Sequence, residues 1–367
     1  MPSPLIFLWD NFGPLHADRC EAVAATGSDV TGLEVHGRSR TYDWTPETGP
    51  GFNKVTLFPQ THNRGWKLLH ALIKFRRKQG RAVWFLCHYD WPEIFAFAIW
   101  LRLRGDKVFT MGCSKFDDIS RRSGREWLKT MFFLPYQGAI GSGIRSRDYF
   151  RFMGIRKDRV AGEYNTVSQD RIRKLSGAPA APEGLPHEQR HFTIVARLVP
   201  KKNLFMALEA YALYAQNCEQ RRSLHICGNG PLDNDLKARA TELGISDHTV
   251  FHGFVQTAEI ARLFGSTLAL ILPSIEEQFG NVVPEAQAMG LPIIISDNCG
   301  ARDLLVRSGV NGFIIEPDNP QGVAFFMKVL SENQSLWRQM CDEANKRAPM
   351  GDVAAFATGV KFLSETK

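Results

Sequence analysis

The chain has 367 residues, more than one compact core usually needs, and its 44% hydrophobic and 23% charged residues are typical of a folded globular protein. Its 7 cysteines are scattered without a CxxC pair, which argues against a disulfide framework or a zinc site and favours a reducing compartment. The formal net charge is +7, with 28 Lys and Arg against 18 Asp and Glu in residues 1–185, which leaves 17 (45 − 28) against 20 (38 − 18) in residues 186–367.

The chain opens with a short apolar run, Leu5 to Trp9, that Asp10 closes. No basic residue precedes the run, so we expect a first buried strand and not a signal peptide. No later run approaches the roughly 18 apolar residues of a membrane-spanning helix.

Short apolar runs of strand length alternate with amphipathic stretches of helix length along the whole chain. The alternation occurs twice, which predicts two parallel, doubly wound α/β sheets. The predicted strands are Leu5–Trp9, Val30–Val35, Val55–Phe58, Ala82–Cys87, Val108–Met111, Ala139–Gly141, Phe192–Val195, Leu224–Cys227, Val250–His252, Leu268–Leu272, Ile293–Ser296 and Gly312–Ile315. The predicted helices include Ala17–Thr26, Trp66–Arg77, Pro92–Leu103, Phe205–Ala215, Asp233–Leu243 and Pro320–Leu330.

A stretch rich in Pro, Ala and Gly separates the two halves. It has no periodicity, which predicts a linker over residues 176–190. We therefore expect one domain over residues 1–175, a second over 191–345, and a C-terminal helix over 346–367 that packs back toward the first. Ligands of such sheets bind beyond the carboxyl ends of the strands, so two facing sheets would enclose a central cleft.

Two glutamates, Glu277 and Glu285, lie eight residues apart on either side of a turn at Gly280. A helix capped by Asn281 is expected to follow the turn, and the N–H groups of residues 281–283 would then form an anion site. The flanking carboxylates would accept hydrogen bonds from hydroxyl groups beside the anion. The alternative is that both glutamates only stabilise the positive end of the helix dipole.

Three earlier strands of the second half end in loops that suit the same ligand. Arg197 and Lys202 follow the first of these strands and can present two cations to one phosphate, unless they are simply a solvated basic loop. The next strand ends in ICGNGP, where Gly228 permits close backbone approach. The third ends in FHGFV, where the backbone at Val255 can meet a nucleotide base.

Over about Phe192 to Pro320, the order and spacing of these motifs resemble the nucleotide-sugar domain of retaining GT-B glycosyltransferases of family 4 (group 1). The resemblance implies that Arg197 and Lys202 stabilise the leaving diphosphate, that Glu277 contacts the donor sugar and that Glu285 holds the ribose. It assigns backbone contacts with sugar and phosphate to Phe279, Gly280, Asn281 and Val282. The family works without a bound metal, so we expect no metal and no cofactor besides a UDP- or GDP-sugar donor.

The first half matches the family less closely. The resemblance places Gly13 beside the donor phosphate and His16 on the acceptor side. Family members often carry a histidine after a later strand of this domain, but here that place has none and leaves Asp117 as a candidate. His88, at the end of the preceding strand, is a possible substitute, although a histidine there is more often structural.

These observations predict a GT-B enzyme with two Rossmann-like domains facing a central cleft, the first for the acceptor and the second for the nucleotide sugar. The expected reaction is hexose transfer with retention, to a glycan or lipid-linked glycan in bacterial cell-surface polysaccharide biosynthesis. Neutralisation of the leaving diphosphate would supply most of the catalysis. The alternative is a catalytically silent sugar-nucleotide sensor or partner subunit on the same fold.

The basic excess of the first half suggests a further partner. Residues 64–81 and 121–136 combine Lys and Arg with Trp and Phe at helical spacing, as in helices that lie on anionic membranes. The alternative is ordinary core-packed helices with solvated outer faces. Binding of nucleic acid is disfavoured, since no recognised motif is present. We therefore expect a cytoplasmic protein at the inner face of the cytoplasmic membrane.

Overall fold

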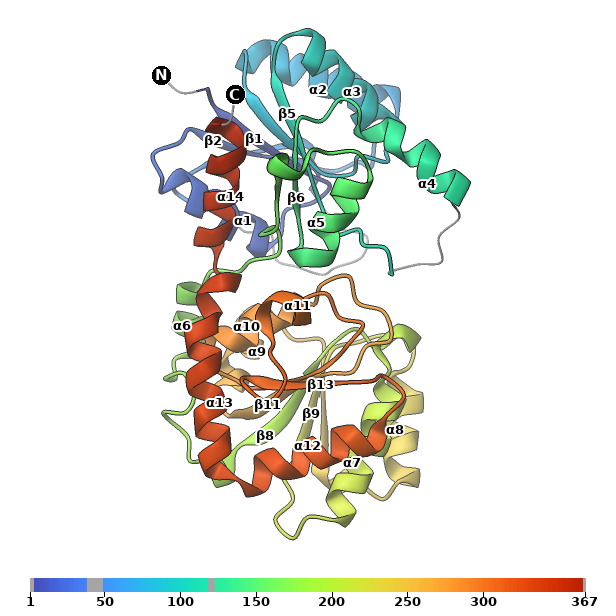
Figure 1. Cartoon of the computed structure of the whole chain (residues 1–367), viewed down its shortest axis with the longest axis vertical. Helices are drawn as coiled ribbons and strands as arrows, with labels where there is room; N and C mark the ends of the chain where they lie inside the picture. Colours follow the sequence, from blue (N-terminus) through green and yellow to red (C-terminus); the bar gives the residue numbers. More distant parts are fainter. Residues whose placement is uncertain (1–2, 38–48, 118–122, 366–367) are drawn as a thin grey trace. The chain divides into compact units, whose positions relative to one another are not determined.

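The computed structural model describes residues 3–37, 49–117 and 123–365 of the chain (Figure 1). The chain forms two compact units, the first made of Met1–Ser168 with Val353–Lys367 and the second of Gln169–Asp352. Each unit holds one parallel sheet with helices packed on it, which confirms the predicted pair of doubly wound α/β domains.

The sheet of the first unit has the strand order β3-β2-β1-β4-β5-β6-β7. Because β1 pairs with β2 on one side and with β4 on the other, the direction of winding reverses there, and ligands of such sheets bind at that reversal. The strands are β1 (Leu5–Trp9), β2 (Val30–His36), β3 (Asn53–Phe58), β4 (Val83–Leu86), β5 (Lys107–Gly112), β6 (Ala139–Gly141) and β7 (Val160–Ala161). The helices are α1 (Pro14–Ala24), α2 (Trp66–Gln79), α3 (Pro92–Leu103), α4 (Ser123–Thr130), α5 (Gly143–Phe152) and α14 (Val353–Glu365).

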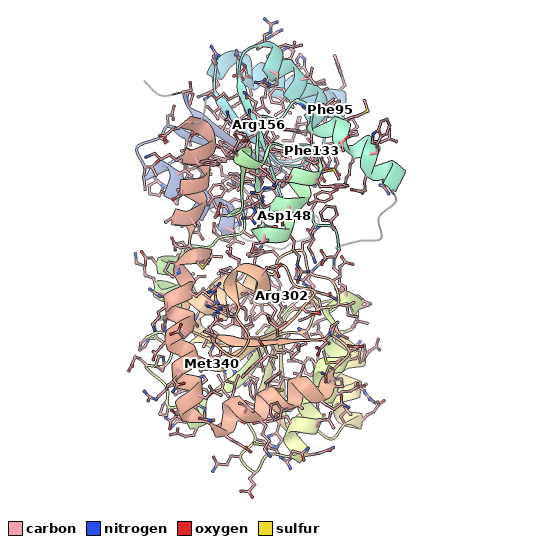
Figure 2. The ribbon with its side chains drawn as sticks, in the orientation of Figure 1. Phe95, Phe133, Asp148, Arg156, Arg302 and Met340 are labelled. Atoms are coloured by element: carbon pink, nitrogen blue, oxygen red, sulfur yellow. The ribbon has the colours of Figure 1, made fainter. Side chains whose placement is uncertain are left out.

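The second sheet repeats this plan in the order β10-β9-β8-β11-β12-β13. Its strands are β8 (His191–Val195), β9 (Leu224–Cys227), β10 (Thr249–Gly253), β11 (Thr267–Leu272), β12 (Ile293–Ser296) and β13 (Gly312–Ile315). Its helices are α6 (Gln169–Ser176), α7 (Leu204–Gln216), α8 (Asp233–Glu242), α9 (Thr257–Phe264), α10 (Val282–Ala288), α11 (Arg302–Leu305), α12 (Pro320–Glu332) and α13 (Gln334–Arg347). Helix α13 buries Trp337 and Met340, the latter labelled in Figure 2, and the Trp337 indole donates to the carbonyl of Leu268 at 2.9 Å.

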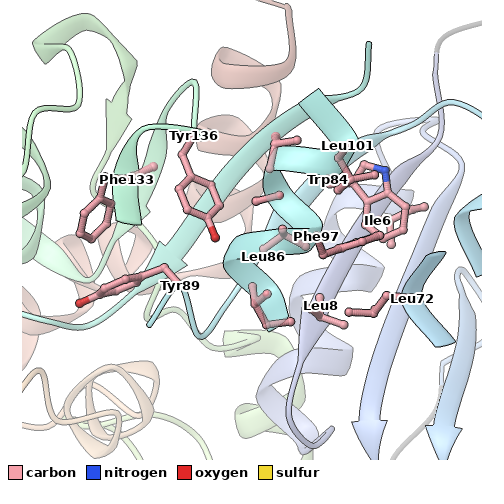
Figure 3. Packing of buried hydrophobic residues seen from close by; sticks show 14 of the residues in the cluster. Ile6, Leu8, Leu72, Trp84, Leu86, Tyr89, Phe97, Leu101, Phe133 and Tyr136 are labelled. Atoms are coloured by element: carbon pink, nitrogen blue, oxygen red, sulfur yellow. The ribbon is translucent and has the colours of Figure 1, made fainter. Parts of the chain in front are cut away.

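The core of the first unit is built around β4 and α3 (Figure 3). Trp84 is fully buried and meets Phe97 edge to face, with 5.2 Å between ring centroids. Beside it the buried carboxylate of Asp106 accepts hydrogen bonds from Arg76 Nη2 and the Ala82 N–H, each at 2.9 Å. A buried carboxylate is tolerated when its charge and lone pairs are matched in this way, so Asp106 ties α2 to the start of β4.

The division of the chain differs from the expected boundaries. Residues 169–176 form helix α6, and both α6 and the Pro-rich residues 176–190 belong to the second unit. Residues 346–352 also belong to the second unit, and α14 begins at Val353 and packs on α1. The composition of residues 176–190 signals an irregular segment, which need not be the point where the contacts of one core give way to those of the next.

Two local features also depart from the expected elements. Helix α1 begins three residues earlier than predicted, because Pro14 suits the first helical position and the His16 side chain caps the backbone N–H of Gly13. Strand β7 was not predicted, since two residues are too few to show a period.

Candidate functional site

The strand-order reversal of the second unit lies at β8, which pairs with β9 and β11. The loops that follow β8 and β11 meet there. The Ile275 N–H donates to the carbonyl of Lys201 at 2.9 Å, and the Asn203 side chain donates to the carbonyl of Pro273 at 3.2 Å. The loop with the predicted cations and the loop with the first predicted glutamate therefore form one wall at the edge where such sheets bind ligands.

Lys202 and Glu277 form a hydrogen-bonded ion pair across these two loops. Their side chains are 13% and 17% exposed, so the pair is shielded from much of the solvent and yet open to a ligand. Screening by salt is weaker for such a pair than for fully exposed charges. One residue from each of two motifs 75 positions apart thus meets at a single point.

The same wall carries two further cations. Arg197 is exposed on the loop after β8, and its carbonyl accepts a hydrogen bond from the Val199 N–H at 2.9 Å. Lys201 pairs with Glu276 at 3.1 Å, and both side chains of that pair are well exposed. The wall can therefore offer positive charge to a phosphate without a change in the protonation of any buried group.

The turn after β11 requires glycine at position 280. Gly280 has φ +99°, and a Cβ there would lie 2.9 Å from Leu272 Cδ2. The turn leads directly into α10, on whose first turn Glu285 lies half-buried. The carbonyl of Phe279 accepts from the Ala301 N–H at 2.9 Å, so the loop after β12 holds this turn in place.

The expected cap and anion site of α10 need correction. Asn281 has φ −58° and ψ −25°, already helical, whereas a capping side chain needs an extended backbone. Its side chain makes no cap hydrogen bond, and Oδ1 is buried without a partner within the described part of the chain. The Val283 N–H donates to the carbonyl of Gly280 at 3.0 Å, so at most two of the three N–H groups of residues 281–283 are available to an anion.

Gly228 and Val255 lie in neighbouring loops of the same edge. The Gly228 N–H donates to the carbonyl of Gly253 at 2.7 Å, two residues before the half-buried Val255. Gly228 has φ +142°, and a Cβ there would lie 1.8 Å from the carbonyl oxygen of Ala196. The close approach that Gly228 permits is therefore to the loop after β8, which aligns three strand ends as one surface.

In the first unit, Gly13 and His16 meet at the start of α1. His16 Nδ1 accepts the Gly13 N–H at 2.9 Å, so the neutral ring carries its hydrogen on Nε2. Burial, with the nearby charge of Arg19, holds the pKa of His16 well below its usual value. His16 is thus a neutral hydrogen-bond donor at this edge.

His88 lies close enough to His16 for its charge to contribute to that lowering. Its backbone has φ +59°, an uncommon conformation for this residue, and its ring stacks on Trp91 with 4.3 Å between centroids. Burial lowers the pKa of His88, although the carboxylates of Asp10 and Asp90 act in the opposite direction.

Asp117 is placed differently from the histidines. Its Oδ2 lies 2.5 Å from Arg145 Nη1 and 3.2 Å from Lys115 Nζ. Burial opposes ionisation, but Lys115 and Arg145 together hold the pKa of Asp117 below its ordinary value. A carboxylate of this kind is a weak proton acceptor, which disfavours Asp117 as a general base.

One pair at this edge was not among the predicted site residues. Asp10 Oδ1 lies 2.5 Å from His36 Nδ1, at the ends of the adjacent strands β1 and β2. The position of Asp10 directly after the first strand was the only signal in the sequence.

Among the described residues, no group of three or more His, Cys, Asp or Glu is arranged to hold a metal ion. Nor does any helix within the described ranges have the length and apolar character that crossing a membrane requires.

Comparison with known proteins shows what this chain resembles. Residues 180–348 match the family model of glycosyl transferases group 1. A D-inositol 3-phosphate glycosyltransferase of Streptomyces scabiei is 30% identical over 208 residues, which are 54% of this chain and 44% of that protein. A UDP-Gal:α-D-GlcNAc-diphosphoundecaprenol α-1,3-galactosyltransferase of Escherichia coli is 33% identical over 135 residues, 36% of this chain and 34% of that protein.

The chain thus spans less than half the length of these two relatives. Among solved structures, Anabaena HepE in complex with UDP and glucose is similar over 99% of this chain and 100% of that one, with a TM-score of 0.71 and 17% identity. The likeness shows that the two units have the GT-B fold.

Proposed function

We propose that this protein is a retaining family 4 glycosyltransferase that transfers a hexose from a UDP- or GDP-sugar to a glycan or lipid-linked glycan. The observation that carries the proposal is the Lys202–Glu277 pair at the strand-order reversal of the second unit. Support comes from the glycosyltransferase domain over residues 180–348 and from the E. coli relative, whose named acceptor is a diphosphate-linked lipid. The setting we propose is cell-surface polysaccharide biosynthesis in bacteria.

A bound donor would replace the ion pair with ligand contacts. The diphosphate takes Lys202 and Arg197, while Glu277 accepts a hydrogen bond from a hydroxyl of the hexose and Glu285 from the ribose. The bond between the anomeric carbon and the β-phosphate oxygen breaks, and the acceptor oxygen bonds to that carbon from the same face. The proton of the acceptor goes to the departing phosphate oxygen. Two cations supply the charge stabilisation, so we propose that no metal is required.

The first unit, in this proposal, binds the acceptor. The neutral Nε2–H of His16 suits an oxygen of the substrates, and the strained backbone of His88 is of the kind found at functional sites. Gly13, at the start of α1, gives the backbone access to a donor phosphate. Asp117 would bind a hydroxyl as an ionised acceptor and would not take its proton.

The first unit also carries an exposed apolar face on α4 and the 3₁₀ turn η1 (Met131–Phe133) that follows it. Trp127, Leu128, Met131 and Leu134, which we call the α4 face, are each at least half exposed, with Leu134 at 78%. The segment is held from beneath by Phe132, whose ring lies 4.9 Å from that of Phe95, labelled with Phe133 in Figure 2. Water-soluble surfaces rarely gather such side chains without a partner.

We propose that the α4 face docks on an anionic membrane surface, which would place the enzyme at the inner face of the cytoplasmic membrane. The exposed Arg125 supplies charge complementary to acidic headgroups. Arg121 and Arg122, part of the predicted basic segment, lie outside the described residues.

Vesicle sedimentation tests this surface. The wild type is expected to sediment with phosphatidylglycerol vesicles but not with phosphatidylcholine vesicles, and 0.5 M salt is expected to weaken the binding. The double variant Trp127→Ser, Leu134→Ser should lose it. Phe325→Ser, which removes an aromatic side chain 61% exposed on α12, is the matched control and should bind like the wild type. Equal binding by the double variant would exclude the α4 face.

Calorimetric titration with UDP, GDP and ADP tests the donor site. One nucleotide is expected to bind in the micromolar range and to bind at least tenfold more weakly to Glu285→Ala and Arg197→Ala. Release of the same nucleotide from its sugar, with EDTA present, then tests turnover. Failure of every nucleotide to bind would refute the proposal, and binding without turnover of any sugar would indicate a partner subunit or sensor.

A further inference from the structure

Three imidazole rings form a row across the second sheet, one on each of the adjacent strands β8, β9 and β10. The rings of His191 and His225 are stacked with 3.8 Å between centroids, and His225 Nδ1 lies 3.0 Å from His252 Nε2. His191 is buried, His225 is half-buried and His252 is exposed. The His225–His252 pair is therefore the end of the row that solvent can reach.

Strand β10 is irregular at the exposed member of this pair. Its register against β9 shifts between Phe251 and Gly253, which leaves His252 as the extra residue of a β-bulge. Bulges of this kind re-aim a side chain and are common next to functional sites. Here the bulged residue brings its imidazole to that of His225, on the neighbouring strand.

The ring of His225 is oriented from two sides. The Ser223 hydroxyl lies 3.1 Å from His225 Nε2 and can accept its hydrogen, which leaves the lone pair of Nδ1 toward His252. Histidines that bind metal ions usually donate their other ring N–H in this way. The stacked His191 is itself fixed, since its Nε2 lies 3.0 Å from the Ser266 hydroxyl. A ligand nitrogen is thus held in place before any ion arrives.

The separation of the two facing nitrogens suits neighbouring ligands of one metal ion. With metal–nitrogen bonds of about 2.0–2.1 Å, the 3.0 Å between His225 Nδ1 and His252 Nε2 corresponds to an angle of about 95° at the metal. Square-planar and octahedral complexes have ligands at such angles, whereas tetrahedral ligands would lie about 3.3–3.4 Å apart. Square-planar and tetragonal sites with nitrogen ligands are typical of Cu²⁺ and Ni²⁺.

The surroundings of the pair also permit a cation. Within the described ranges, His252 is the one charged group that acts on the pKa of His225, so no lysine or arginine lies close enough to repel the ion. No third His, Cys, Asp or Glu of the described residues joins the pair as a ligand. Water would therefore fill the remaining coordination positions.

We propose that His225 and His252 together bind a divalent transition-metal ion of the Cu²⁺ or Ni²⁺ type, with water as the other ligands. The ion replaces the hydrogen bond between the two rings. Where His252 Nε2 carried the hydrogen of that bond, the hydrogen moves to Nδ1 of the same ring, so both rings stay neutral and no proton is released. The site is independent of the glycosyl transfer proposed above, which needs no metal.

The position of the site gives the ion a structural effect. His252 directly precedes Gly253, whose carbonyl accepts the Gly228 N–H at 2.7 Å. The bound ion therefore fastens β9 to β10 just before the two loops that follow them. Because the ion binds the folded chain, it should raise the midpoint of thermal unfolding.

Calorimetric titration with NiCl₂ tests the site on the full chain, first freed of metal with EDTA and then separated from it. One ion is expected to bind. His252→Gln and His225→Gln each keep a polar side chain but lose a ligand nitrogen, and each should weaken the binding at least tenfold. Electron paramagnetic resonance with Cu²⁺ should show two nitrogen ligands in the wild type and at most one in either variant.

His70→Gln is the matched control, because it removes an exposed histidine of α2 in the first unit. It should bind Ni²⁺ like the wild type and be stabilised by it to the same extent. If the wild type binds no Ni²⁺, or if His252→Gln and His225→Gln bind it as tightly as the control, the assignment is wrong. Loss in only one of these two variants would likewise overturn a shared site. Zinc bound at least tenfold more tightly than nickel would overturn the assigned geometry. Unfolding curves without metal show that each variant is folded.

Discussion

The two units wind their sheets alike and differ in how the strand ends are joined. In both, the first four strands of the unit lie in the order third, second, first, fourth. In the second unit the loops after β8, β9, β10 and β11 are joined by backbone hydrogen bonds. In the first unit, backbone hydrogen bonds such as that from the His36 N–H to the Asp10 carbonyl at 2.7 Å are supplemented by the side-chain pairs Asp10–His36 and Arg64–Glu93. The architecture thus fixes where ligands bind, while the loops decide what binds.

The surfaces of the two units differ in the same sense. The most exposed large apolar side chains, Leu103, Trp66, Leu134 and Trp127, all belong to the first unit. The second unit places its charges in pairs at the strand ends and exposes fewer apolar groups among the described residues.

The largest effect on activity is expected from the cations of the second unit. Lys202→Ala and Arg197→Ala each remove a charge that stabilises the leaving diphosphate, and each is expected to lower donor turnover by about 10²–10³-fold. The rate of nucleotide release under saturating donor measures it, and a thermal unfolding curve confirms that each variant is folded. A loss of less than about fivefold in both variants would mean that the charge is stabilised elsewhere.

A substitution at one glycine should disrupt the backbone hydrogen bonds that join the loops of the second unit. Gly228→Ala would place a methyl group 1.8 Å from the Ala196 carbonyl oxygen, where only backbone movement can make room. We expect a loss of about 3 kcal/mol or more in unfolding free energy, together with loss of nucleotide binding.

Gly244→Ala is the control for this change. Gly244 has φ +67° but no atom within 4 Å of an added Cβ, so only the backbone strain of about 1–2 kcal/mol is expected. Urea unfolding measures both variants. Equal destabilisation would show that the contact with Ala196 can relax.

The sequence predicts a structural feature well when the residues that cause it are close together in the chain. The ends of β1, β6, β9, β12 and β13 were predicted to the residue, because apolar runs bounded by polar residues are local signals. Lys202 and Glu277 were predicted to contact the same ligand, at its diphosphate and its sugar, but nothing in the sequence predicted that the two side chains pair with each other. Gly228 was predicted to allow close approach, but its neighbour, Ala196, lies 32 positions away (228 − 196) and could not be identified.

In the first unit, the Asp10–His36 pair could not be predicted from the sequence. Asp10 and His36 are ordinary residues at the ends of two strands, and neither is part of a motif. Their pairing depends on the register of β1 against β2, in which Trp9 lies opposite Glu34. At Asn281 a clear local signal gave a wrong prediction. Asn is a good capping residue, but here its backbone has helical dihedral angles and its side chain makes no cap hydrogen bond.

Acid should affect the second unit through its stacked histidines. The rings of His191 and His225 lie 3.8 Å apart between centroids, and His252 Nε2 lies 3.0 Å from His225 Nδ1. Burial, with the neighbouring imidazoles, lowers the pKa of His191 to about 3 and that of His225 to about 4. The unfolded chain takes up these protons near pH 6.5, so stability is complete above that value and falls as the pH drops toward 4.

When the pH is lowered from 8 to 5, His191 and His225 together are expected to reduce the free energy of unfolding by on the order of 2–4 kcal/mol. Urea unfolding at both values measures this. His225→Gln removes one titrating ring and should flatten the pH dependence by about half. A wild type equally stable at pH 5 and pH 8 would contradict the expected direction.

The smallest effect on donor turnover is expected at Lys201, directly beside Lys202, where one of the largest is expected. Lys201 and Glu276 directly precede Lys202 and Glu277 in the same two loops and also form an ion pair, at 3.1 Å, but their side chains are 43% and 36% exposed. An exposed pair contributes at most about 1 kcal/mol, and its charge is screened from a bound phosphate by solvent. Lys201→Ala should therefore change donor turnover by less than about threefold, against the 10²–10³-fold loss for Lys202→Ala. Because the two variants remove the same charge from adjacent positions, comparable losses would show that the net charge of the loop matters more than the contact with Glu277.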